Sequence, residues 1–146
     1  MMRTEDIKDK IRKYEIFVEE KLKSDLKEVE NKLHSKNLSY QEWEEVEHMS
    51  KIVQEFKVKD EDMLLNLELE KGVMGYGEVT DFGEVFVDVG LGYLLKMEPD
   101  EAVKYAEIRK KALKREVEHY RQLAVEIKVH IKLVLLAVNE LHSTIK

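Results

Sequence analysis

The feature that most constrains the fold of this chain is a hydrophobic repeat that occurs near both ends. Close to the C-terminus, apolar residues recur at alternating steps of three and four: Leu113, Val117, Tyr120, Ala124, Ile127, Ile131, Val134, Val138, Leu141 and Ile145. A rougher version near the N-terminus consists of Ile7, Ile11, Tyr14, Val18, Leu22, Leu26, Val29 and Leu33. An apolar residue at about every 3.5 positions makes helices supercoil around a partner helix. Each end of the chain is therefore predicted to form one helix of a coiled coil.

The segment between the two repeats follows a period of two and is rich in glycine. Its first alternating run consists of Leu65, Leu67 and Leu69, and its second consists of Val85, Val87 and Val89. Alternation of apolar and polar side chains indicates β-strands with one buried face. Glycines interrupt or follow these runs, at Gly72, Gly75, Gly77, Gly90 and Gly92. We therefore predict about four short strands, in two hairpins, over residues 63–97.

The helices on either side are predicted to be long and nearly equal, over residues 6–57 and 99–145. Ser39 and Glu42 fit a capping box, which would restart the first helix, but no glycine or proline interrupts the stretch, so a continuous helix is favoured. Pro99 suits the first turn of the second helix. The predicted fold class is α+β, mainly α. It is a long antiparallel coiled-coil helical hairpin, with two short β-hairpins between the helices, in a single domain over residues 1–146.

The charges are unevenly distributed along the two predicted helices. The window 42–62 contains eight acidic residues and three lysines, whereas the window 104–121 contains seven basic residues and three glutamates. In an antiparallel hairpin these windows lie side by side, so their charges would favour one orientation and register. The alternative is that both windows are simply solvated faces, because exposed ion pairs contribute only about 0.2–1 kcal/mol each.

The composition excludes several classes of protein. The chain has no cysteine, which rules out a disulfide framework and a thiolate metal site. Its net charge of -6 argues against direct binding to nucleic acid, since such proteins present a basic face. The first residues lack the apolar core of a secretory signal, and no apolar run approaches the roughly 20 residues that span a bilayer. We therefore expect a soluble intracellular protein without membrane association.

The side chains that usually perform catalysis or bind metals are scattered. The five histidines form no H-x-x-x-H pair, and they stand at His34, His48, His119, His130 and His142. The glycines match neither G-x-G-x-x-G nor a phosphate loop ending in GK[ST]. No nucleophile is paired with a base in a recognisable pattern. We therefore expect no enzyme activity, no catalytic residues, no metal and no cofactor.

The segment 63–97 is too short to supply a further element that could cover the apolar faces of the predicted strands. Isolated hairpins are only marginally stable in water, and bare strand edges promote aggregation. We therefore predict an obligate oligomer in which the strands pair with those of other subunits. The predicted interface residues are Leu67, Leu69, Val85, Val87, Val89, Tyr93 and Leu95. The alternative is burial of these residues within a small core of the chain itself.

The order long helix, two hairpins, long helix resembles that of prefoldin subunits of the α class. The local matches are Leu67–Leu69 leading into Gly72, the stretch 85–93 (VFVDVGLGY) and the stretch 100–105 (DEAVKY). Within this class the chain most resembles the UXT, or prefoldin-α-like, branch, through residues 12–18 (RKYEIFV) and 90–93 (GLGY). The resemblance extends from about residue 7 to residue 145.

This resemblance implies a chaperone or co-chaperone subunit that acts in a hetero-oligomer of α-class and β-class subunits. Such assemblies bind non-native or unassembled client proteins without ATP, through the tips of their coiled coils, and work with a chaperonin or with AAA+ ATPase machinery. It also implies residence in the cytoplasm and the nucleus. The alternative function is a coiled-coil adaptor, or transcriptional cofactor, that scaffolds regulatory complexes.

Both ends of the chain would lie at the tip of such a hairpin, where apolar residues exceed the number that one seam requires. A surplus apolar surface suits transient capture of unfolded chains. The predicted client-binding residues are Ile7, Ile11, Tyr14, Phe17, Leu136, Leu141 and Ile145. The alternative is that these residues thicken the intramolecular seam or contact a neighbouring subunit.

Overall fold

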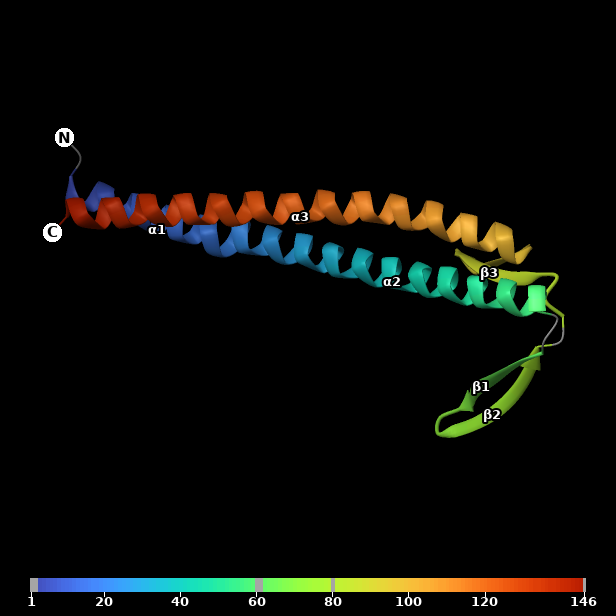
Figure 1. The fold of residues 1–146 in the computed structure, drawn as a ribbon. Helices are drawn as coiled ribbons and strands as arrows, with labels where there is room; N and C mark the ends of the chain where they lie inside the picture. The colour runs from blue at the N-terminus through green and yellow to red at the C-terminus, as the bar shows by residue number, and fades with distance from the viewer. Residues whose placement is uncertain (1–2, 60–61, 80, 146) are drawn as a thin grey trace. The chain divides into compact units, whose positions relative to one another are not determined.

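The computed structural model describes residues 3–59, 62–79 and 81–145, except for the side chains of residues 67–70. The elements are α1 (Thr4–Ile16), a π-helix η1 (Phe17–Leu22), α2 (Lys23–Lys59), β1 (Met63–Glu70), β2 (Val73–Val79), β3 (Val85–Gly90), β4 (Tyr93–Met97) and α3 (Pro99–Thr144). The described chain is thus mainly helical, with two small strand pairs between the helices, as the sequence predicts (Figure 1). Its two compact units consist of Met1–Leu38 with Lys114–Lys146, here called the terminal unit, and of Ser39–Leu113, here called the hairpin unit.

The N-terminal helical stretch is continuous through the serine-rich segment at Ser35 and Ser39, because α2 spans both residues. The expected continuity is therefore confirmed. The π-helical turns of η1 were not predicted. Within them, the backbone N–H of Lys23 donates to the carbonyl of Val18, five residues earlier, which is the hydrogen bond that defines a π-helix. Val18 and Leu22 are both buried, so the wider turns keep the seam facing its partner helix.

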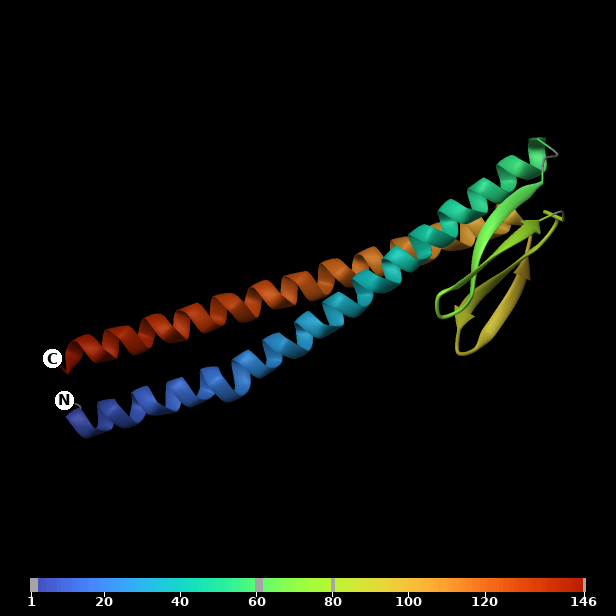
Figure 2. The same ribbon diagram turned by 90° about the horizontal axis from the view of Figure 1, so that it is seen from below.

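The terminal unit is a pair of helices that lie side by side in both views (Figures 1 and 2). Ile7 and Ile11 of α1 and Val138 of α3 form its buried apolar cluster. Ion pairs also join the helices, with Lys36 Nζ 3.1 Å from Glu116 Oε2 and Lys128 Nζ 3.6 Å from Glu30 Oε1. The two hydrophobic repeats of the sequence therefore meet in an antiparallel pair.

The hairpin unit contains the larger core. Its buried residues come from both helices and from the second strand pair: Trp43, Val87, Met97, Ala102, Ala106 and Leu113. The Trp43 ring meets the Tyr105 ring edge to face, with centroids 5.3 Å apart. Ala102 and Ala106 are fully buried. Their short side chains let the strands approach α3 closely, which brings Val87 into the core.

The strands form two separate two-stranded antiparallel sheets, β1 with β2 and β3 with β4. The registers pair Met63 with Val79 and Val85 with Met97. In the second turn Gly90 and Gly92 have φ of +99° and +78°, a conformation that favours glycine. Asp88 Oδ1 accepts a hydrogen bond of 2.9 Å from the Gly90 N–H, so this turn is fixed by its own side chain.

The start of α3 agrees with the sequence prediction. Pro99 occupies the first helical position, and Asp100 and Glu101 lie in the first turn, where the helix dipole favours negative charge. The N–H of Ala102 donates to the carbonyl of Glu98 at 3.0 Å, which closes the first turn. The described residues thus confirm the order of two long helices with two hairpins between them.

Candidate functional site

The first candidate surface lies on the terminal unit, where the sequence predicted client binding. Five of the seven predicted residues pack within the unit. Ile7 and Ile11 are buried beside Val138, and Tyr14, Leu141 and Ile145 pack against this cluster. These side chains therefore have the intramolecular seam as their main environment.

The other two predicted tip residues are exposed. Phe17 has 39% and Leu136 has 52% of its surface accessible. The Phe17 ring meets the His130 ring edge to face at 5.8 Å, so only its outer side is free. Beside Leu136 lies a depression of about 530 Å³, lined by Lys10, Tyr14, Leu136, Ala137, Glu140 and Leu141.

Leu136 belongs to an exposed stripe on α3 that the sequence analysis did not define. Its members Val125, Val129, Leu133 and Leu136 follow steps of four, four and three, and all of them are exposed. Helical side chains at these steps share one face of the helix. The buried residues Val117, Ala124 and Val138 occupy the other face, so the stripe points away from the seam. The sequence indicated this stripe only through apolar residues that lie between the seam positions and are not needed for the seam.

The second candidate surface lies on the two strand pairs. The sheet β1–β2 exposes Leu64, Val73, Met74 and Tyr76, and Tyr76 has 89% of its surface accessible. The sheet β3–β4 and its turn expose Phe86, Leu91, Tyr93, Leu94 and Leu95. Each sheet has only two strands among the described residues, so each has unpaired edges. Exposed apolar faces with unpaired edges are features of strands that bind other strands.

The predicted interface residues on these strands fall into three groups. Tyr93 and Leu95 are exposed, as an interface requires. Val87 is only 5% exposed, and Val85 and Val89 pack against the core that contains it. These three valines therefore have the intrachain environment that the sequence analysis ranked second, and Val87 needs no second chain to cover it. The side chains of Leu67 and Leu69 lie outside the described residues.

Several exposed apolar residues of this surface were not predicted from the sequence. They are Leu64, Met74, Tyr76, Phe86 and Leu94. Phe86 and Leu94 alternate with residues that were chosen, so they lie on the opposite face of the same strands. The alternation identified the two faces correctly but did not show which face the helices cover.

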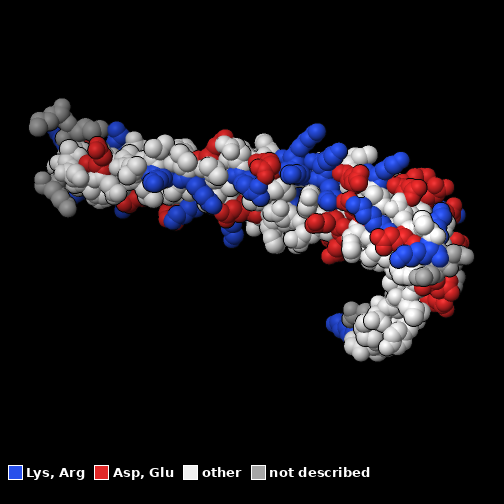
Figure 3. All heavy atoms as spheres, in the orientation of Figure 1, with Lys and Arg blue, Asp and Glu red and all other residues white. Residues whose placement is uncertain are grey.

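In the hairpin unit, an ion pair joins the acidic window 42–62 to the basic window 104–121. Lys110 Nζ lies 2.8 Å from Glu47 Oε2, and Lys51 Nζ lies 2.9 Å from Glu47 Oε1. The hydrogen bonds from Lys110 and then Lys51 lower the pKa of Glu47, and the bond to Glu47 raises the pKa of Lys110. On the face shown in Figure 3, basic and acidic side chains are interspersed along the helices. The pairing of the two windows is confirmed at this position.

A pair of carboxyl groups lies on the first strand pair. Glu78 of β2 shares a hydrogen bond with Asp62, and this bond, together with the nearby negative charge, raises the pKa of Glu78. Among the described residues, no group of three or more carboxylates and imidazoles is arranged to hold a metal ion. No described helix is long and apolar enough to cross a membrane.

Two long helices that close on each other, with two small antiparallel hairpins between them, restrict the choice of family. The sequence model of the prefoldin subunit family matches residues 26–141, which is most of the chain. This chain belongs to the prefoldin subunit family. It is also 28% identical, over 138 residues, to a protein of Nematostella vectensis named Protein UXT homolog. The alignment covers 94% of this chain and 87% of that protein.

The match to the prefoldin family confirms the family resemblance that the sequence carried. The similarity to the Protein UXT homolog agrees with the resemblance to the UXT branch. The match spans most of α2, the strand pairs and most of α3. The chain is therefore a prefoldin-like coiled-coil subunit. Its described strands combine exposed apolar side chains with unpaired edges.

Proposed function

We propose that this prefoldin-family chain is a chaperone or co-chaperone subunit of a hetero-oligomeric prefoldin or prefoldin-like complex. The complex binds non-native or unassembled client proteins without ATP. The strand pairs contact other subunits, and the exposed apolar residues of the terminal unit contact clients. The observation that carries the proposal is that one chain has two small sheets with apolar faces and unpaired edges, and also an exposed apolar stripe on α3.

Assembly with other subunits is supported by the poor burial of the first strand pair. A two-stranded hairpin is marginally stable in water unless a further strand or helix covers one of its faces. The sheet β1–β2 leaves Leu64, Met74 and Tyr76 exposed and has two unpaired edges. Strands of α-class and β-class subunits would cover these faces and complete the hydrogen bonds of the edges. This burial explains why the chain carries apolar residues that its own helices do not cover.

Client binding is supported by the exposed residues of the terminal unit. Phe17, Leu136 and the neighbouring members of the α3 stripe present apolar surface without a deep pocket. Such a surface binds many sequences weakly, since it offers contact area and few directional groups. Ile7 and Ile11 act indirectly, because their packing against Val138 holds the two helices together. Clients bound in this way would then be passed to a chaperonin or to AAA+ ATPase machinery, in the cytoplasm and the nucleus.

The proposal is tested by purifying the tagged chain from its native cells and identifying the subunits that copurify. The complex, rebuilt from those subunits, is expected to suppress the aggregation of a chemically denatured model enzyme without nucleotide. The double variant Phe17→Ser/Leu136→Ser should assemble normally but suppress aggregation several-fold less well. Ile108→Ser is the control, since Ile108 is exposed on α3 in the other unit.

Each part of the proposal can fail separately. If the rebuilt complex forms but does not suppress aggregation, the chaperone function is wrong and the adaptor function takes its place. If the double variant suppresses aggregation as well as the wild type, clients bind elsewhere. Tyr76→Asp should reduce the recovery of copurifying subunits, and full recovery with this variant would show that β2 is not an assembly surface.

A further inference from the structure

One side of α2 carries a shallow groove that neither the intrachain seam nor the proposed tip contacts explain. Three adjoining depressions, of about 540, 450 and 350 Å³, follow this side of the helix in the hairpin unit. Neighbouring depressions share residues: Glu42, Glu45, Val46, Met49 and Asp88. The groove extends from Ser39 to Val53, and β3 forms its second wall through Val85 and Phe86. This length of helix corresponds to about four turns, or roughly 21 Å.

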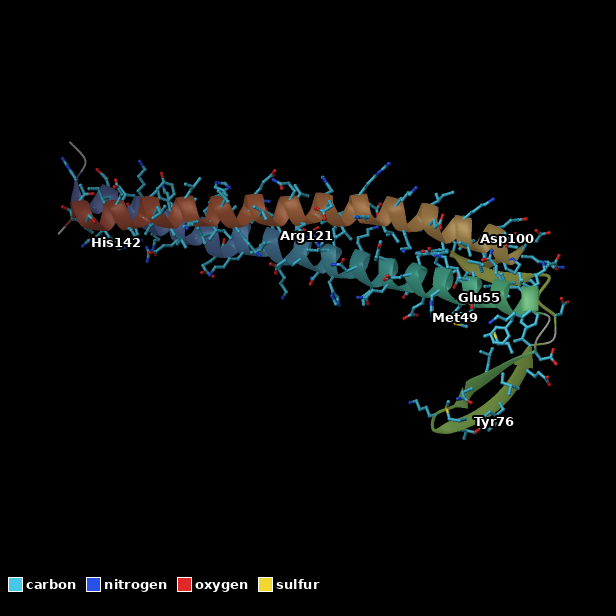
Figure 4. All side chains as sticks on the ribbon, in the orientation of Figure 1. Met49, Glu55, Tyr76, Asp100, Arg121 and His142 are labelled. Carbon is cyan, nitrogen blue, oxygen red and sulfur yellow. The ribbon has the colours of Figure 1, made fainter. Side chains whose placement is uncertain are left out.

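The floor of the groove has the spacing of a helix-packing stripe. Val46, Met49 and Val53 follow steps of three and four, as the residues of a coiled-coil seam do. Val46 borders the core, because it packs against the cluster that contains Trp43, whereas Met49 lies outside that cluster. Met49 has 41% of its surface accessible and projects from the side of α2 that faces away from α3 (Figure 4). The groove thus offers a second seam to a further helix.

The rim of the groove is acidic. Four acidic residues line the three depressions, namely Glu42, Glu44, Glu45 and Asp88, and none of them forms an ion pair with another described residue. Among the described residues that line the groove, the only lysine or arginine is Arg109. Its guanidinium lies 5.5 Å from the centre of the Trp43 ring, so it is already engaged with this chain. The potential over the groove therefore favours a ligand with positive charge.

We infer that this groove binds a basic amphipathic helix of a partner protein. The apolar residues of that helix would pack on Val46, Met49 and Val53, and lysines or arginines beside them would pair with Glu42, Glu45 and Asp88. A helix fits better than an extended strand, because the floor repeats at three and four residues over several turns. The flexible side chain of Met49 can adapt to different apolar partners. This surface goes beyond the proposed chaperone function, since a folded partner would be recognised by charge and spacing.

The test uses two designed peptides and the full-length chain. Both peptides are helical, about four turns long, with leucines at coiled-coil spacing. The first carries lysines beside the leucines, and the second carries glutamates at the same positions. Fluorescence anisotropy of the labelled peptides should show at least about tenfold tighter binding of the lysine peptide at low salt, with the difference shrinking as salt is added.

Substitutions in the groove test whether the peptides bind there. Glu42→Lys/Glu45→Lys should weaken the lysine peptide and strengthen the glutamate peptide, and Met49→Ser should weaken both. The charge-matched control is Glu20→Lys/Glu126→Lys, because these exposed glutamates lie in the terminal unit. The control variant should bind both peptides as the wild type does. Circular dichroism of each variant checks that the helices are retained.

Several outcomes would overturn the inference. One is failure of the lysine peptide to bind, or equal affinity for the two peptides. Another is binding that the groove substitutions do not change. The same titration is repeated on the complex with copurifying subunits. Loss of peptide binding there, together with protection of the β3 amides from exchange, would identify a strand of a sister subunit as the occupant instead.

Discussion

Lys110 Nζ lies 2.8 Å from Glu47 Oε2 and joins α3 to α2 near the core of the hairpin unit. The Glu47 side chain is only 12% exposed, and its other oxygen accepts a hydrogen bond from Lys51. The acidic window of the sequence therefore meets the basic window at a carboxylate with both oxygens engaged. A partly buried and doubly bonded pair of this kind fixes register better than exposed pairs do.

Replacing Glu47 by Gln should lower the free energy of unfolding by about 1 kcal/mol, because Lys110 loses its charged acceptor. Urea unfolding at fixed protein concentration measures this change. Glu28→Gln is the control, since Glu28 forms an exposed pair with Lys32 on one helix. We expect a change within about 0.5 kcal/mol there. Equal effects of the two substitutions would show that the pair between the helices has no special role.

The contribution of Glu47 should also depend on pH. Its pKa is lowered in the folded chain, so its contribution is present above the ordinary carboxyl pKa of 4.5 and is lost as the pH falls through the folded value. The pKa of Lys110 is raised, so its contribution is present below 10.5 and is lost at more alkaline pH. The stability difference between the wild type and Glu47→Gln should therefore be constant near neutrality and vanish in acid. A difference that persists at pH 2 would contradict the pairing.

Enlarging Ala106 tests the close approach of the second strand pair to α3. Ala106 is fully buried in the cluster that contains Val87 and Met97. Leucine cannot fit there without moving the strands, so Ala106→Leu should destabilise the chain by about 1–3 kcal/mol. The matched control is Ala112→Leu on the exposed side of the same helix, which should be nearly neutral. Denaturant midpoints of both variants provide the comparison, and equal midpoints would mean that the strands do not rest on Ala106.

The positions of the strands were predictable from the sequence because alternation and glycine are local signals. Val85, Val87 and Val89 alternate, and Gly90 and Gly92 end the run, which is how β3 and its turn are built. The covering of those valines was not predictable in the same way. Burial of Val87 depends on Ala102 and Ala106, which look like ordinary good helix formers when the sequence is read alone. Val87 meets these two alanines only in the folded chain, where β3 packs against α3.

The π-helical turns had a signal that the sequence analysis did not use. Tyr14, Val18, Leu22 and Leu26 follow three successive steps of four, whereas the C-terminal repeat alternates threes and fours. A mean of four residues per turn exceeds the 3.6 of an α-helix, so the helix must widen to keep these residues on one face. The structure places η1 at this run, over Phe17–Leu22. The exposure of Phe17 and Leu136 had a weaker signal, because both are apolar residues outside the seam positions and a repeat does not show what covers such residues.

The carboxyl pair on the first hairpin should make that hairpin sensitive to pH. The pKa of Glu78 is raised by its hydrogen bond with Asp62, so the stabilising contribution is present below the ordinary pKa of 4.5 and is lost as the pH rises through the folded value. At neutral pH the two carboxylates repel each other. Glu78→Gln should therefore increase the exchange protection of the β2 amides at pH 7 and change it little at pH 4. Protection that is lower in the variant at pH 7 would contradict this sign.

Removing one residue from η1 tests whether the π-turns absorb an extra residue. A deletion of Glu20, which is exposed, should convert η1 into α-helix while Ile7 and Ile11 still face Val138. The free energy of unfolding should then change by less than about 1 kcal/mol, because the seam is preserved on both sides. Urea unfolding and amide exchange of α1 measure the result.

The same deletion elsewhere should have a different effect. Removing Asn31, an exposed residue of α2, leaves no wide turn to absorb the change, so the seam on one side rotates by about 100° relative to the other. Several apolar side chains then leave the interface, at about 1.5–3 kcal/mol for each one exposed. We therefore expect exchange protection of α1 to survive the loss of Glu20 and to collapse with the loss of Asn31. If both deletions disrupt α1 equally, the π-turns do not hold a surplus residue.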